Sequence, residues 1–172
     1  MKIAAAFVIL MLATLAVGQT SIGPFTIDAP PPNLPQCKPA PNASSGGEVC
    51  TEWSSVTPGE RTASIWNFPY PDACLQIDLM DVGTIQHIEG TFEDAYCVQM
   101  SSDLRKKFGV PMVQRFNRQN AFGARWTETS LRWNRKGVHV EFYLGADGCA
   151  LEVQTPRYYN DPRNRVAEAA HF

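Results

Sequence analysis

The feature that most constrains the fold of this chain is an amphipathic segment at residues 92–111. Acidic residues occupy its first turn and basic residues its last, as the helix dipole favours. Gly109 suits a left-handed residue after a helix, and Pro111 prevents continuation. The pattern predicts one helix with a single buried face, which needs a partner layer. At 100° per residue, four apolar residues form that face: Cys97, Met100, Leu104 and Phe108.

The segments around this helix alternate apolar and polar residues, the period of half-buried strands. Short turns join consecutive strands, which indicates antiparallel pairing. Residues 112–120 are basic and polar and predict a mobile connection. We therefore expect an α+β domain over residues 61–160: one helix on one face of a mostly antiparallel sheet of about five strands, ordered strand–strand–helix–strand–strand–strand. The main strand patterns lie at residues 74–80, 84–92, 125–133, 138–144 and 149–153, with a first strand signal near 63–68.

The two ends of the chain differ in composition from the centre. Residues 1–18 predict a signal peptide, because Lys2 precedes an apolar run that ends in small residues. That run is shorter than the roughly 20 residues needed to span a bilayer. We expect a periplasmic or extracellular protein with no membrane span in the mature chain. Residues 19–60 form a Pro/Gly/Ser-rich arm, and residues 161–172 a short helix or tail that begins at Asp161 and Pro162.

Five cysteines remain after the predicted cleavage, and export favours their oxidation to disulfides. Cys37 and Cys50 bracket a proline-rich stretch that a disulfide would order. Cys97 on the inner helix stripe and Cys149 on an inner strand face predict a second pair, which leaves Cys74 unpaired. A pair between Cys74 and Cys149 is the main alternative. The sequon at Asn42 matters only in a eukaryotic host.

The order of these signals resembles that of small secreted bacterial proteins of unknown function. The residues that carry the resemblance are 34–37 with Cys50, the helix end at 104–111, the turn at 120–124 and the strand at 138–142. The resemblance implies a fold and an exported location. It implies no catalytic residue, because these motifs are a cysteine pair, a helix end and turns.

Few residues suggest catalysis or metal binding. His87 and Glu89 share one strand face, as do His139 and Glu141, so two His-x-Glu pairs are candidate ligands of a divalent metal. Ordinary alternation of surface residues explains them better, and we expect no metal or other cofactor. Cys74 beside His87 is a conceivable nucleophile, but a structural cysteine fits the pattern better. The nucleophile-elbow and phosphate-loop motifs are absent from the sequence.

Charge is distributed unevenly along the chain. Residues 19–104 hold two basic and eleven acidic residues, whereas residues 105–136 hold nine basic residues and only Glu128 as an acid. Arg125, Trp126 and Arg132 are the candidates for an anion-binding surface, since guanidinium groups bind carboxylate and phosphate. Simple solvation of charged surfaces is the competing explanation.

These observations favour a non-enzymatic binding or envelope-associated module over an enzyme. Its expected partners are an anionic envelope component or an acidic protein rather than nucleic acid, because the net charge is −2. A small metal-dependent or hydrolytic enzyme that uses His87 and His139 is the first alternative. A structural assembly subunit is the second.

Overall fold

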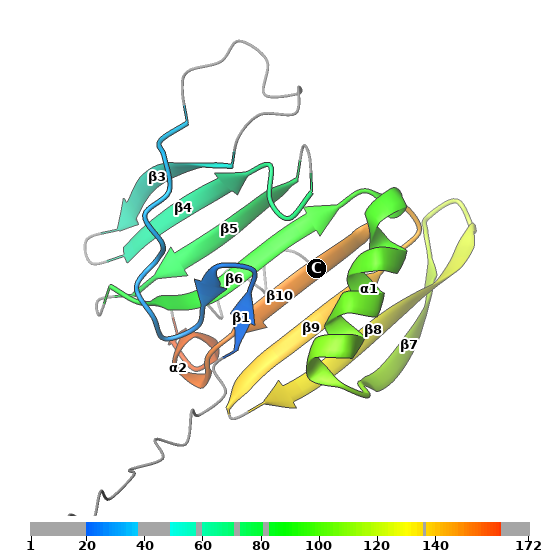
Figure 1. The fold of residues 1–172 in the computed structure, drawn as a ribbon. Coiled ribbons are helices and arrows are strands. Elements are labelled where there is room, and N and C mark those ends of the chain that lie inside the picture. The colour runs from blue at the N-terminus through cyan, green and yellow to red at the C-terminus, as the bar shows by residue number, and fades with distance from the viewer. Residues whose placement is uncertain are drawn as a thin grey trace, which may run out of the picture.

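The computed structural model describes residues 20–37, 49–57, 60–70, 73–80, 83–135 and 137–162 (Figure 1). The predicted signal peptide, the sequon at Asn42 and nearly all of the predicted tail helix lie outside these residues. Neither helix in the described part of the chain has the length and apolar character needed to cross a membrane.

A large antiparallel sheet dominates the described chain, with the strand order β3-β4-β5-β6-β10-β9-β8-β7. Two four-stranded meanders, β3 to β6 and β7 to β10, join where their last strands pair. The strands are β3 (Cys50–Thr57), β4 (Glu60–Trp66), β5 (Cys74–Leu79), β6 (Ile85–Phe92), β7 (Met112–Gln119), β8 (Arg125–Arg135), β9 (Val138–Leu144) and β10 (Cys149–Gln154).

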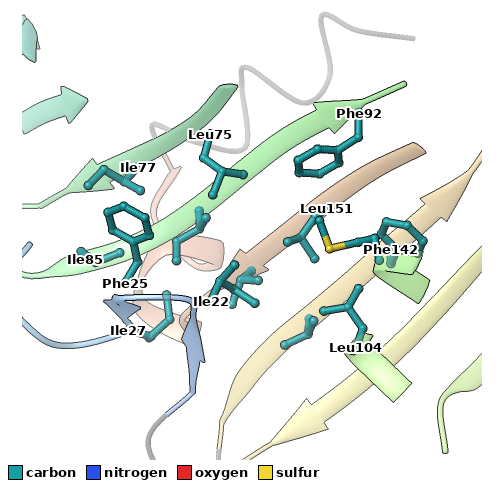
Figure 2. Close-up of a cluster of buried hydrophobic side chains, with 14 of the residues drawn as sticks. Ile22, Phe25, Ile27, Leu75, Ile77, Ile85, Phe92, Leu104, Phe142 and Leu151 are labelled. Atoms are coloured by element: carbon teal, nitrogen blue, oxygen red, sulfur yellow. The ribbon is translucent and has the colours of Figure 1, made fainter. Parts of the chain in front are cut away.

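One face of this sheet, here called the helix face, packs against a second layer of apolar side chains. The helix α1 (Asp94–Phe108) crosses it, and the small ribbon of β1 (Ser21–Ile22) and β2 (Phe25–Thr26) lies on the same side (Figure 1). From that ribbon, Ile22, Phe25 and Ile27 point into the cluster formed by the sheet side chains (Figure 2).

The expected α+β fold with about five strands is wrong. The protein is mainly β, with eight strands in one sheet, two more in the ribbon and only two short helices in the described chain. The error lies in the strand count and order, because the helix forms where the apolar stripe indicates. Its buried residues are Cys97, Met100, Leu104 and Phe108.

Two strands of the large sheet were not predicted, because neither shows a clean apolar alternation; the ribbon strands β1 and β2 were not predicted either. β7 lies at the edge of the sheet, and seven of its eight side chains are exposed, so it has no buried face to mark in the sequence. It occupies most of the segment expected to be a mobile connection. β3 falls within the segment assigned to the proline-rich arm, and its pairing with β4 is irregular between Ser54 and Thr57.

The two edges of the sheet are finished differently. At the β3 edge, Thr51 N–H donates to the Pro35 carbonyl at 2.9 Å, and Cys37 N–H donates to the Thr51 carbonyl at 3.0 Å. The segment before β3 therefore covers the start of that edge. At the β7 edge, no described segment pairs with the outward backbone groups of β7.

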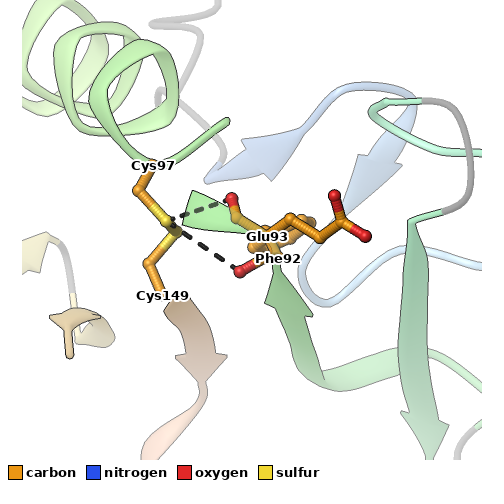
Figure 3. Close-up of a disulfide and its surroundings, with 4 residues drawn as sticks. All are labelled: Phe92, Glu93, Cys97 and Cys149. Carbon is orange, nitrogen blue, oxygen red and sulfur yellow. Dashed lines mark hydrogen bonds between the residues drawn. A yellow bond between two sulfur atoms is a disulfide. The ribbon is translucent and has the colours of Figure 1, made fainter. Parts of the chain in front are cut away.

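Two disulfides fasten segments to the sheet. Cys37 is bonded to Cys50, which joins the segment before β3 to that strand, and Cys97 is bonded to Cys149, which joins α1 to β10 (Figure 3). These are the two pairs that the sequence favours. Cys74 is the free cysteine among the described residues.

The helix α2 (Pro156–Tyr159) follows β10 directly, earlier than the predicted tail helix. Thr155 caps it: its hydroxyl accepts from Tyr158 N–H at 3.1 Å and donates to Gln86 Oε1 at 2.9 Å. Pro156 then occupies a first-turn position, where its missing N–H costs nothing.

Replacement of Thr155 with valine is expected to lower the free energy of unfolding by about 1–2 kcal/mol. Valine keeps the shape but removes the cap and leaves Gln86, which is buried, without this donor. Urea denaturation followed by circular dichroism measures the change. The exposed Thr91 provides the matched control, since Thr91→Val should change stability by less than about 0.5 kcal/mol. Equal effects in the two variants would contradict the capping role.

Candidate binding surface

The outer face of the sheet, opposite α1, carries most of the polar side chains of the central strands. Side chains alternate between the faces, so Ile77, Ile88 and Val153 enter the core while their neighbours point outward. Antiparallel register then aligns the outward residues into rows that cross the strands. One row runs Asp78, His87, Gln154, His139, and the next runs Gln76, Glu89, Glu152, Glu141, Arg132.

His87 lies at the centre of a buried polar cluster on this face. Its side chain is only 4% exposed, and its Nδ1 lies 2.8 Å from Asp78 Oδ2. Its Nε2 lies 3.4 Å from Glu152 Oε1. The ring stacks on Tyr158 of α2 at a centroid distance of 4.2 Å, and the Tyr158 hydroxyl donates to Asp78 at 3.0 Å. The cluster therefore holds α2 against the outer face.

The charge of His87 follows from these neighbours. Burial by itself would lower the pKa of His87, but the hydrogen bond with Asp78 and the contact with Glu152 outweigh it. With the charges of Asp78 and Glu89, they raise the pKa of His87 to about 9. Burial would raise the pKa of Asp78, yet its hydrogen bond and ion pair with His87 hold it below the ordinary value. At neutral pH the pair is an imidazolium and a carboxylate.

Glu141 is the centre of a second cluster. It is 4% exposed, and it accepts from the Ser130 hydroxyl and from Arg132 Nε, each at 2.5 Å. His139 Nε2 lies 3.1 Å from its other oxygen. Burial would raise the pKa of Glu141, but these hydrogen bonds and the charge of Arg132 lower it to about 2. Glu141 is thus a buried, permanently ionised group whose partners neutralise it.

The two His-x-Glu pairs share the outer face, but they do not converge on one point. His87 and His139 both lie opposite Gln154, on the two sides of β10. Each histidine already contacts a carboxylate of its own cluster. In the described part of the chain, no group of three or more His, Cys, Asp or Glu side chains is placed to hold a metal ion.

Cys74 does not form a dyad with His87. The cysteine pairs with Thr91, whereas Asp78, four residues along β5, pairs with His87. Four residues of strand correspond to roughly 13 Å. Burial raises the pKa of Cys74, despite a hydrogen bond with Ser64 that lowers it, so its thiol stays protonated at neutral pH.

Among the three anion-binding candidates, Arg132 lies apart from the other two. Trp126 and Arg132 share the outer face, but six residues of β8 separate them by roughly 20 Å. Arg125 alternates with Trp126 along β8, and both line a second depression that also includes Arg118. The charge of Arg132 is matched by Glu141 at 2.5 Å.

A depression of about 480 Å³ on the outer face is a feature that the sequence did not reveal. It lies between Trp126 and Tyr143, and the turn at residues 145–148 closes one side. Trp126 was singled out from the sequence, but Tyr143, Glu128 and Asp147 were not. The alternation of β9 marks Tyr143 as outward-facing, yet only the strand register brings it into this depression.

Comparison with known proteins gives no match: no family model, no curated protein and no solved structure is similar to this chain.

Proposed function

We propose that the protein is an exported, non-enzymatic binding module that captures an extended acidic segment of a partner protein as an added strand on β7. The bare edge of β7 carries this proposal. Export is supported by the signal-peptide pattern of residues 1–18 and by the two disulfides. Nothing in the geometry of His87 or His139 favours hydrolysis, since each ring is held by a carboxylate of its own cluster.

An uncovered edge strand presents a row of backbone donors and acceptors to any extended chain. β7 has eight residues, longer than a typical strand, and its outward groups have no partner among the described residues. The β3 edge, by contrast, is covered at its start and fixed by the Cys37–Cys50 bond. The bare edge is therefore a local property of β7.

Charge selects the occupant of this edge. Arg115 and Arg118 lie on alternate faces of β7, so an added strand meets a guanidinium on both of its faces. Arg118 is paired with Glu128 at 2.8 Å, whereas Arg115 forms no ion pair with any described residue. Pairing of β7 with a second copy would bring the arginines of both copies onto one ladder, which like-charge repulsion disfavours. An acidic segment removes that repulsion.

The test uses a capped decapeptide of alternating Thr and Glu as the probe and an alternating Thr and Lys decapeptide as its counterpart. Titration into ¹⁵N-labelled protein should shift the β7 amides and slow their hydrogen exchange for the Glu peptide only. Arg115→Glu should weaken that binding about tenfold. Arg157→Glu, an equal charge change on the exposed side of α2, should leave it unchanged.

Three outcomes would overturn the proposal: equal binding of the two peptides, shifts confined to other strands, or no effect of Arg115→Glu. Sedimentation of the unliganded protein adds a fourth. If the unliganded protein forms concentration-dependent dimers, and Arg115→Glu either abolishes or strengthens them, the occupant of the β7 edge is a second copy instead.

A further inference from the structure

The depression between Trp126 and Tyr143 has the chemistry of a cation site. Its volume of about 480 Å³ falls within the size range of sites that bind small ligands or single side chains. Two aromatic rings flank it, from β8 and from β9, and Thr91 and Ala150 are among the residues that line it. We infer that this depression binds a cationic group, a guanidinium or an ammonium, between the Trp126 and Tyr143 rings.

The Trp126 side of the depression is held in place without a ligand. Trp126 Nε1 donates to Glu128 Oε1 at 3.0 Å, and Arg118 Nε donates to the other oxygen of Glu128 at 2.8 Å. The hydrogen bond from Trp126, with that from Arg118, lowers the pKa of Glu128, which therefore stays ionised. The indole ring thus has a fixed orientation beside a carboxylate.

Tyr143 provides the second aromatic surface. Its side chain is 37% exposed, so part of the ring is accessible from solvent. Burial, with the nearby charge of Glu141, raises the pKa of Tyr143, so the phenol stays neutral and its ring keeps an electron-rich face. Trp126 and Tyr143 both line the depression, from neighbouring strands. Aromatic faces attract cations in such positions.

The charged residues that line the depression are both carboxylates, which favours a cation. Asp147 at the β9–β10 turn lines it and forms no ion pair with any described residue. Glu128 also lines it, and its charge is paired with Arg118 at 2.8 Å. The carboxylates farther along the outer face are already paired, Glu152 with His87 and Glu141 with Arg132, so Asp147 and Glu128 are the acids that bear on the depression.

The backbone keeps the depression open. Gly148 has φ +141°, and a Cβ at this position would lie 2.5 Å from the Phe92 carbonyl oxygen, so the turn requires glycine there. Gly145 N–H donates to the Gly148 carbonyl at 2.9 Å. The next residue, Cys149, is bonded to Cys97 of α1 (Figure 3). The site is therefore pre-formed, and its contact with β7 is made through Arg118, which pairs with Glu128.

The test uses N-acetyl-arginine methylamide as the probe and the citrulline analogue as its neutral counterpart. The Trp126 indole N–H signal in ¹⁵N NMR spectra reports binding directly. We expect saturable shifts with the arginine probe at millimolar concentration and none with citrulline. Asp147→Asn should weaken binding three- to tenfold, and Trp126→Ala at least tenfold, read from the Ala150 and Thr91 amides. Asp103→Asn, on the exposed side of α1, should change nothing.

A citrulline analogue that binds as well as arginine would overturn the inference, as would an Asp147→Asn variant with unchanged affinity. Asp147 lies in an exposed turn, so we expect the Asp147→Asn variant to fold even if Trp126→Ala does not. Two further probes identify the source of the cation. Tighter binding of a Gly-Gly-Arg-Gly-Gly peptide points to a side chain of a partner protein, and tighter binding of tetramethylammonium points to a free small cation.

Discussion

Replacing Cys97 and Cys149 together with alanine is expected to lower the free energy of unfolding by about 4 kcal/mol. The disulfide links residues 52 positions apart, and in the chain-entropy description a loop of that length restricts the unfolded state by roughly this amount. Both residues are buried between α1 and β10, so the link also holds the helix on the sheet. Urea denaturation without reductant, followed by tryptophan fluorescence, measures the loss.

The Cys37–Cys50 bond provides the matched comparison. It links residues 13 positions apart, so its removal by the same double alanine substitution is expected to cost about 3 kcal/mol. The first variant should also release α1, whereas the second should affect the start of β3. Hydrogen exchange of the α1 amides separates the two effects. A smaller loss for Cys97–Cys149 than for Cys37–Cys50 would contradict this assignment of the longer link as the main covalent restraint.

The helix α1 was predictable because a single 15-residue element carries its whole signal. Its four buried residues follow one helical stripe, and Gly109 ends it with φ +79°. The strands β5, β9 and β10 each bury one face. They were predictable because apolar and polar residues alternate along them. The edge strand β7 was not, since a strand exposed on both faces has no such alternation.

The polar clusters were beyond prediction because they depend on register between strands. His87 reads as a surface residue, as it alternates with buried neighbours, and yet it is 3% exposed. Its burial results from Tyr158, 71 positions later, which packs on it from α2. Likewise Trp126 was expected beside Arg132 as part of an anion site. The register instead brings it beside two carboxylates, Glu128 and Asp147.

Stability is expected to fall by up to about 3 kcal/mol as the pH rises from 6.5 to 9. The folded protein holds the proton of His87 up to about pH 9, whereas the unfolded chain releases it near pH 6.5. Stabilisation by the imidazolium is thus complete below about pH 6.5 and is lost as the pH rises through 9. The groups that face His87 are Asp78, Glu152, Glu89 and Tyr158. Asp78 acts in the opposite direction, because its lowered pKa gives stability that disappears only in acid.

Urea denaturation at half-unit pH steps measures this slope, and two histidine variants separate its origin. His87→Gln removes the titrating group, so its stability should be lower at pH 6 and nearly flat up to pH 9. His139→Gln removes a histidine that is 31% exposed, and it should keep the slope of the unmodified protein. A slope that persists in His87→Gln would show that another group titrates in this range. Because Tyr158 stacks on His87, loss of the imidazolium should also loosen α2 first, which hydrogen exchange at Tyr158 and Tyr159 would report before global unfolding.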